Sequence, residues 1–167
     1  SNRPLRILHL TAGSDAGGLS RYIYDLAGAM IAQGHPVGVA GERGAWHELF
    51  ANSPIPWIDV PLKGNPLALW RASRALRRWM AHEPVDVLHT HYRRATLVAR
   101  RLQSRHRPPI IYTVHLSDLA LNGPRRWVSD FGDFTHVASA EARRWTIEAG
   151  HVAPERITLI PQGINTS

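Results

Sequence analysis

One glycine-rich segment and two histidine-bearing segments hold the residue types in this chain that could do chemistry. The glycine-rich segment, Gly13–Gly18, follows the apolar run Ile7–Leu10 and precedes a helical pattern. Glycine lets the backbone approach a ligand closely, and a helix start presents unpaired N–H groups and the positive end of the helix dipole. We therefore expect an anion site at Gly17 and Gly18. An ordinary turn between a strand and a helix is the competing interpretation.

The histidines follow two further apolar runs. His89 and His91 come after Val85–Leu88, and His115 comes directly after Ile110–Val114. Ligands of open α/β sheets bind beyond the carboxyl ends of the strands. Imidazoles placed there can hydrogen-bond a hydroxyl or a phosphate, or move a proton. A purely structural role for each histidine is the alternative.

A metal or a nucleotide cofactor is a further alternative at this edge. Strand alternation places His89 and His91 on one face, so a zinc site with His115 as third ligand is an alternative. The chain has no His-Glu-x-x-His motif, and three-histidine sites depend on fixed partners around the ligands. The glycine spacing also fits neither the dinucleotide fingerprint nor a Walker loop. We expect no metal and no cofactor.

Apolar, β-branched runs alternate with helical patterns along the chain, which is typical of a parallel sheet with crossover helices. The expected strands are Ile7–Leu10, Val37–Ala40, Ile55–Val60, Val85–Leu88, Ile110–Val114, Thr135–Ala138 and Ile157–Ile160. The expected helices are Leu19–Met30, Pro66–His82, Ala95–Arg105 and Ala140–Ala149. The predicted fold class is α/β: a doubly wound, mainly parallel sheet of about seven strands with helices on both faces. Residues 1–167 form a single domain in this interpretation.

The charge indicates an anionic partner. Twenty lysines and arginines face 13 acidic residues, a net charge of +7, and such an excess favours phosphates or anionic surfaces. Nucleic acid is not expected, because no reading motif accompanies the charge. The predicted helix Pro66–His82 is basic on its outward face, so it could lie on an anionic membrane, with a merely solvated surface as the alternative. Its outward residues are Arg71, Arg74, Arg77 and Arg78.

Cysteine is absent, which excludes disulfide and thiolate chemistry and is typical of a reducing compartment. No apolar run is long enough to cross a bilayer. We expect a cytoplasmic location, with contact at the inner face of the membrane.

Four segments, in the same order, resemble the retaining family 4 glycosyltransferases of GT-B fold. Residues 5–21 resemble the opening strand and glycine loop of that family. Residues 85–91 are similar to its D-V-[IL]-H-x-H strand, and Tyr112–His115 matches its T-x-H strand end. Residues 161–165 resemble its interdomain P-N-G-[IV]-D segment, with Gln162 and Asn165 where asparagine and aspartate are usual.

The resemblance implies the N-terminal, acceptor-side domain of a two-domain enzyme. The donor is then a UDP- or GDP-linked sugar, held mostly by a C-terminal domain missing from this chain, and the acceptor is a carbohydrate or a lipid-linked sugar. No metal or cofactor is implied. The resemblance makes His115 the catalytic residue beside the reacting sugar. The implied donor-diphosphate or acceptor-binding residues are Gly17, Gly18, Asp15, Arg21 and His91.

Two other functions share this scaffold. One is a stand-alone phosphate- or nucleotide-binding Rossmann-like module, and the other is half of a GT-B nucleotide-sugar epimerase. The family's donor-domain carboxylates, E-x7-E, and its phosphate-binding Arg/Lys pair do not occur within these residues. We therefore expect the chain alone to transfer no sugar.

Overall fold

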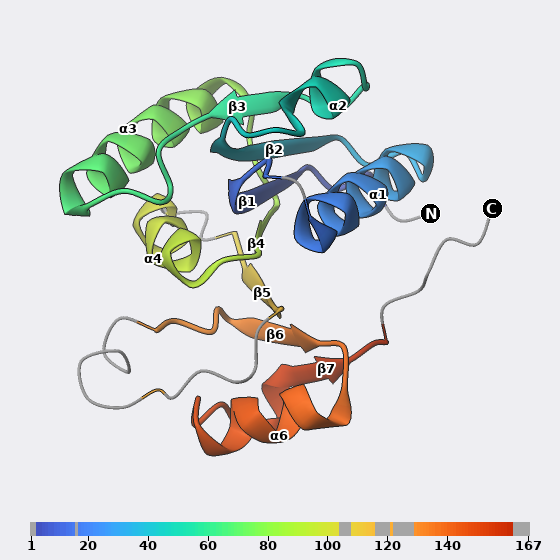
Figure 1. Cartoon of the computed structure of the whole chain (residues 1–167), viewed down its shortest axis with the longest axis vertical. Helices are drawn as coiled ribbons and strands as arrows, with labels where there is room; N and C mark the ends of the chain where they lie inside the picture. The colour runs from blue at the N-terminus through green and yellow to red at the C-terminus, as the bar shows by residue number, and fades with distance from the viewer. Residues whose placement is uncertain (1–2, 16, 104–107, 116–120, 122–128, 162–167) are drawn as a thin grey trace.

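The computed structural model describes residues 3–15, 17–103, 108–115, 121 and 129–161 (Figure 1). Within them, seven strands form one sheet in the order β3-β2-β1-β4-β5-β6-β7, and every neighbouring pair is parallel. The strands are β1 (Ile7–Gly13), β2 (Val37–Glu42), β3 (Trp57–Asp59), β4 (Val87–Thr90), β5 (Ile110–Val114), β6 (Phe134–Val137) and β7 (Ile157–Leu159). Because all strands run the same way, their carboxyl ends meet at one edge.

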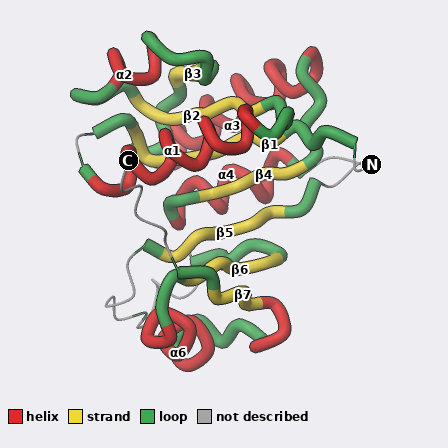
Figure 2. Tube along the Cα trace, turned by 90° about the vertical axis from the view of Figure 1, so that its right-hand side faces the viewer, coloured by secondary structure: helices red, strands yellow, loops and turns green. Residues whose placement is uncertain are grey.

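Helices cover both faces of the sheet, as predicted, and Figure 2 shows α1 in front of the ladder of strands. The helices are α1 (Gly18–Ala32), α2 (His47–Ala51), α3 (Pro66–His82), α4 (Arg93–Leu102) and α6 (Ala140–Glu148). Helices α1 and α2 pack on one face, and α3 and α4 pack on the other. Helix α6 packs against β6 and β7. The predicted α/β class is confirmed.

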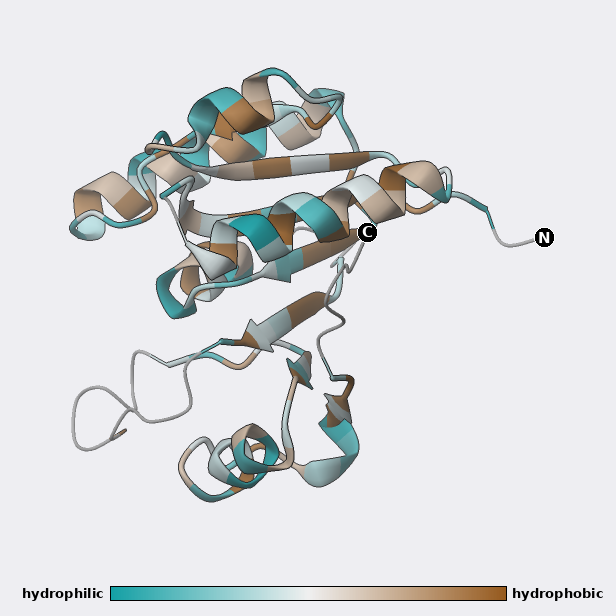
Figure 3. Cartoon of the chain, turned by 45° about the vertical axis from the view of Figure 1, so that its right-hand side comes forward, coloured by the Kyte–Doolittle hydropathy of each residue, from teal (hydrophilic) through white to brown (hydrophobic). Residues whose placement is uncertain are grey.

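The central strand β1 lies between both layers, so its residues alternate between two buried faces. Leu8 and Leu10 pack in the core beneath α3 and α4, whereas Ile7 packs beneath α1. By the same alternation His9 and Thr11 share the α1 side with Ile7, and both are buried. The strands carry mostly hydrophobic residues in Figure 3, whereas the helices mix the two kinds. Among the described residues, no helix combines the length and apolar character needed to cross a bilayer.

Two local predictions differ from the structure, and two others lie outside the described residues. Strand β4 begins two residues later than expected, so His89 and Thr90 lie inside the strand. The short elements α2 and the 3₁₀ turn η1 (Pro154–Arg156) were not predicted, because single turns leave little periodicity to read. The predicted end of the helix near residue 105 and the segment resembling the interdomain linker, residues 162–165, lie outside the described residues.

Two helix ends depend on glycine for different reasons. Gly34 follows α1 with φ of +87°, the left-handed conformation of a C′ glycine at a helix end. Gly150 lies just beyond the end of α6, but the left-handed residue there is His151, at φ of +52°. A Cβ on Gly150 would lie 2.6 Å from the carbonyl oxygen of Thr146. Gly150 is therefore required by close packing.

Candidate functional site

The candidate site lies at the carboxyl edge of three neighbouring strands. β1, β4 and β5 are adjacent in the sheet, so the loop after β1, His91 after β4 and His115 after β5 reach the same edge. Tyr22, in the second turn of α1, has its ring centroid 5.2 Å from that of His115 and 6.0 Å from that of His91. The structure thus brings the start of α1 and both predicted histidines together.

A cluster of three buried imidazoles underlies this edge. In the β1–β4 pairing His9 stands directly opposite His89. The ring centroid of His9 lies 4.9 Å from that of His89 and 5.2 Å from that of His91, and the latter two are 4.2 Å apart. His115 lies 5.5 Å from His91 and is only partly buried. His115 is therefore the histidine of the group that a ligand can reach.

Two hydrogen bonds connect His9, His91 and His115 in a row. Nδ1 of His9 is 2.9 Å from Nε2 of His91, and Nδ1 of His91 is 3.2 Å from Nε2 of His115. Both ring nitrogens of His91 are thus engaged. The Nε2 atom of His9 is buried and has no hydrogen-bond partner among the described residues.

A second row of hydrogen bonds starts at His89. Its Nε2 lies 2.7 Å from the hydroxyl of Thr113, which lies 3.1 Å from Nδ1 of His136. Nε2 of His136 lies 2.9 Å from the carbonyl oxygen of Ile160, which can only accept, so His136 donates there. The two rows hold the rings of β1, β4, β5 and β6 in fixed orientations.

Burial keeps the central imidazoles neutral. It lowers the pKa of His9 to about 4 and, with a smaller contribution from His136, lowers the pKa of His115 to about 4. The pKa values of His89 and His91 lie well below the ordinary value, first because of burial and then because of the neighbouring histidines. At neutral pH these rings act as hydrogen-bonding groups and carry no charge.

Three histidines of this cluster are close enough together to be considered as ligands of a metal ion. His9, His89 and His91 each offer a nitrogen, and these atoms lie within 4.8 Å of one another. These three histidines differ from the zinc ligands considered from the sequence, because His9 takes the place of His115. An ion would have to displace the hydrogen bond between His9 and His91, and within the described residues no carboxylate is hydrogen-bonded to these rings to orient them. The expectation of no metal remains a prediction.

The glycine loop has the form expected of a backbone anion site. Gly17 caps α1 with φ of +154° and ψ of 174°, a conformation that favours glycine strongly, and no side chain caps the helix. A Cβ at Gly17 or at Gly18 would meet no atom within 4 Å. The hydroxyl of Ser20 donates to the carbonyl oxygen of Asp15 at 2.5 Å, which ties the loop to the first turn. There is therefore room for a side chain at both glycines, and no side chain occupies the cap position of the first helical N–H groups.

The two charged residues of the predicted binding set both have ion-pair partners. The carboxylate of Asp15 pairs with Lys63, which follows β3. Arg21 pairs with Asp25 one turn along α1, at 2.8 Å. Both predicted residues are exposed, and both ion pairs are of the exposed kind that contributes little to stability. A ligand can exchange these partners at small cost.

The basic face of α3 is as predicted. Arg71, Arg74, Arg77 and Arg78 are exposed, while the inward residues pack on the sheet. Trp70 is exposed beside Arg74, whose guanidinium carbon lies 5.6 Å from the ring centroid. Trp79 differs from this pattern: it packs against the core, close to Gly38.

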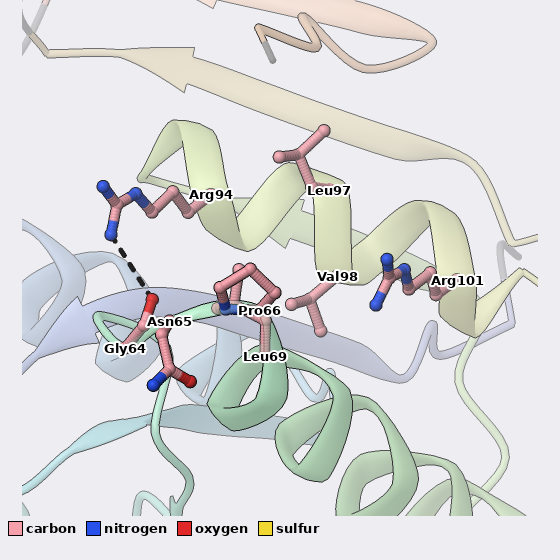
Figure 4. Close-up of a pocket in the computed structure, with 8 residues that line it drawn as sticks. All are labelled: Gly64, Asn65, Pro66, Leu69, Arg94, Leu97, Val98 and Arg101. Carbon is pink, nitrogen blue, oxygen red and sulfur yellow. Dashed lines mark hydrogen bonds between the residues drawn. The ribbon is translucent and has the colours of Figure 1, made fainter.

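A groove of about 380 Å³ runs between α3 and α4 (Figure 4). Leu69, Leu97 and Val98 give it an apolar floor. Arg94 and Arg101 border it, and Nη1 of Arg94 donates to the carbonyl oxygen of Lys63 at 3.0 Å. No local sequence pattern indicates this groove, because its lining comes from two helices separated by a strand.

The predicted site residues came from local motifs, and these missed part of the cluster. His9 lies inside an apolar run and was assigned to a strand only. Thr113 belongs to the T-x-H motif, but only the histidine of that motif has a predicted role; His136 and Tyr22 belong to no motif. Strand alternation is the signal that could have found His9: it shares the face of the strand that carries Thr11, and a parallel neighbour would place it opposite His89.

The fold defines a class: this is a Rossmann-like α/β domain, and open α/β sheets in general bind their ligands beyond the carboxyl ends of the strands. The chain matches the family model of Glycosyltransferase Family 4 over residues 16–167 and belongs to this family. No curated protein matches the sequence.

Solved structures share the fold at low sequence identity. A glycosyltransferase from Rickettsia africae has a TM-score of 0.75 at 15% identity, with 96% of this chain and 44% of that chain covered. Anabaena Alr3699/HepE, solved in complex with UDP and glucose, has a TM-score of 0.78 at 19% identity, with coverage of 96% and 45%. UDP-N-acetylglucosamine 2-epimerase from Rickettsia bellii has a TM-score of 0.64 at 11% identity, with coverage of 93% and 44%. The chain spans less than half of each structure, and its fold is that of one half of a GT-B protein.

Proposed function

We propose that this chain is the N-terminal, acceptor-side half of a retaining glycosyltransferase. The enzyme moves a hexose from a UDP- or GDP-linked donor to a hydroxyl of a carbohydrate or lipid-linked acceptor. Membership of the family supports this proposal. The observation that carries it is the meeting of two features at one edge: a glycine-started helix without a side-chain cap, and the accessible neutral imidazole of His115.

Each residue has a defined task in this proposal. The N–H groups at Gly17 and Gly18 meet the donor diphosphate or the acceptor, because the helix start favours negative charge. Asp15 and Arg21 exchange their present ion-pair partners for ligand groups. His115 is the catalytic residue: its Nδ1 contacts the reacting sugar, since its Nε2 is engaged by His91. The reaction needs no metal, because helix dipoles and basic side chains stabilise the developing phosphate charge.

The donor-binding half is a separate requirement. The phosphate-binding residues that the resemblance implies for the second domain do not occur in these residues, so the chain alone transfers no sugar. The test uses the two-domain protein with UDP- and GDP-linked hexoses, and NMR follows the anomeric proton of the product. Retained configuration and acceptor-dependent release of UDP or GDP support the proposal.

Two other outcomes contradict it. Release of nucleotide with an epimerised sugar and no need for an acceptor identifies an epimerase, an alternative that the fold shared with the Rickettsia bellii protein favours. Nucleotide binding without any turnover in the two-domain protein identifies a binding module.

We also propose peripheral contact with an anionic membrane at its cytoplasmic face. Helices α3 and α4 carry eight of the 20 basic residues and no acidic residue, so the remaining 12 basic residues face all 13 acidic ones. The two helices are therefore strongly basic, although Arg100 of α4 pairs with Asp130 and Asp133. Exposed Leu67 and Trp70 add apolar groups beside this positive charge. Such a combination is typical of surfaces that lie on anionic lipid.

A further inference from the structure

The row His9, His91 and His115 has two buried members. The resemblance implies a ligand contact for His91, but both of its ring nitrogens are engaged by the neighbouring histidines. His9 is 0% exposed and His91 is 3% exposed. Burying polar rings is unfavourable unless their hydrogen bonds are satisfied, so the burial of His9 and His91 calls for an explanation. The row ends at His115, which is the only accessible member.

The two hydrogen bonds of this row must run in the same direction. A neutral imidazole carries one N–H and one lone pair, and all three rings are neutral. If His9 donates from Nδ1 to Nε2 of His91, then His91 donates from Nδ1 to Nε2 of His115, and the proton of His115 lies on Nδ1. If the row runs the other way, His115 donates from Nε2 and its Nδ1 carries the lone pair.

The far end of the row selects the direction. Nε2 of His9 is buried without a partner among the described residues. The reverse direction would place an N–H at this atom, and buried N–H groups without an acceptor are rarer in proteins than buried acceptors without a donor. The direction towards His115 leaves only a lone pair at Nε2 of His9.

We propose that His9 and His91 are positioning residues that hold His115 in its Nδ1–H tautomer, so that His115 offers an N–H donor to the ligand. Hydroxyl and phosphate oxygens accept such a bond, and both occur in a nucleotide-diphosphate sugar. The benefit to catalysis rests on the proposed function, whereas the tautomer is a property of the chain itself. The bond from Nδ1 is then oriented before the ligand arrives, which is how an active site avoids reorganisation during the reaction.

NMR of the chain tests the tautomer of His115 directly. The ¹⁵N shifts of the histidine rings are read from two-bond ¹⁵N–¹H spectra at neutral pH without ligand. We expect His115 to be an Nδ1–H tautomer in the unsubstituted chain. His9→Leu removes the end of the row, frees the proton of His91, and gives His115 a mixture of tautomers. His9→Asn keeps an amide donor at the position of Nδ1 and restores the single tautomer.

The matched control is His89→Leu, because His89 is buried in the same cluster but bonds to Thr113 instead. We expect this variant to leave the tautomer of His115 unchanged, and thermal unfolding of each variant shows that it is folded. An Nε2–H tautomer of His115 in the unsubstituted chain, or an unchanged tautomer in folded His9→Leu, overturns the proposal. So does an equal change in His89→Leu, which would make the effect one of packing.

Turnover by the two-domain protein separates this inference from the proposed function. We expect His9→Leu to lower kcat more than it raises KM, and His9→Asn to recover most of the loss. A tautomer that behaves as expected while His115→Ala keeps full turnover would refute the role of His115 in catalysis and leave the positioning of its proton intact.

Discussion

The conformation of Gly17 allows the clearest quantitative prediction. A side chain at this position would strain the backbone without clashing with any neighbouring atom. The φ of +154° at Gly17, with ψ of 174°, lies in a region that only glycine occupies readily. A Cβ would meet no atom within 4 Å, so Gly17→Ala introduces no clash. Strain of this kind costs about 1–3 kcal/mol. We expect Gly17→Ala to lower the free energy of unfolding by that amount.

The neighbouring residue provides the matched control. Gly18 opens α1 without a positive φ and is also surrounded by open space, so alanine is tolerated there. Alanine in a helix is more favourable than glycine by roughly 0.5–1 kcal/mol, so Gly18→Ala leaves stability unchanged or raises it. Urea unfolding with the slope m compared among the three proteins measures the difference. Equal stabilities of the two variants would refute the reasoning about the loop.

The remaining predictions concern turnover, membrane contact and pH. In the two-domain protein His115→Ala should lower kcat about 10²–10³-fold, as expected for a transition-state contact. His82→Ala, at an exposed histidine of α3, should leave kcat unchanged, and a normal kcat for His115→Ala would remove His115 from the mechanism. Replacing three arginines of α3 by serine should weaken the sedimentation of the protein with vesicles of anionic lipid, and the loss should be largest at low salt. Replacing three exposed arginines elsewhere by serine should weaken it less. These sets are Arg74, Arg77 and Arg78, and Arg3, Arg43 and Arg144. Equal losses would indicate net charge alone. For pH, the lowered pKa of His9, about 4 in the folded chain against about 6.5 unfolded, means that the unfolded chain takes up the proton first as pH falls. The free energy of unfolding should therefore fall between pH 6.5 and 4, with His9 contributing up to about 3 kcal/mol of the loss. Urea unfolding of His9→Leu should show a smaller loss over the same pH range. An equal loss would mean that His9 is not a neutral buried ring.

Most of the fold could be predicted because the signals for it are local. The apolar runs of β1 and β5 are continuous, as expected for strands buried on both faces. The helical pattern between Gly18 and Gly34 places its apolar residues on one side. Short elements such as α2 were missed, because five residues form too little of a helical period to stand out.

The candidate site divides in the same way. The glycine start of α1 and the histidines that follow β4 and β5 are local features, and their order along the chain already indicated a common edge. The arginines of α3 were also visible in the sequence, because a helical period separates an outward face from an inward one.

Only the tertiary structure decided what these residues contact. His9 belongs to an apolar run in the sequence, but the β1–β4 register sets it opposite His89 and within hydrogen-bonding distance of His91. The groove between α3 and α4 likewise combines side chains from two helices. The amino-acid sequence by itself therefore determined which segments form strands and helices, since that follows from local periodicity. The pairing of distant strands determined which imidazoles form hydrogen bonds with one another. A hydrogen bond depends on the register of the strands and on the distance between the rings, and no local pattern encodes either.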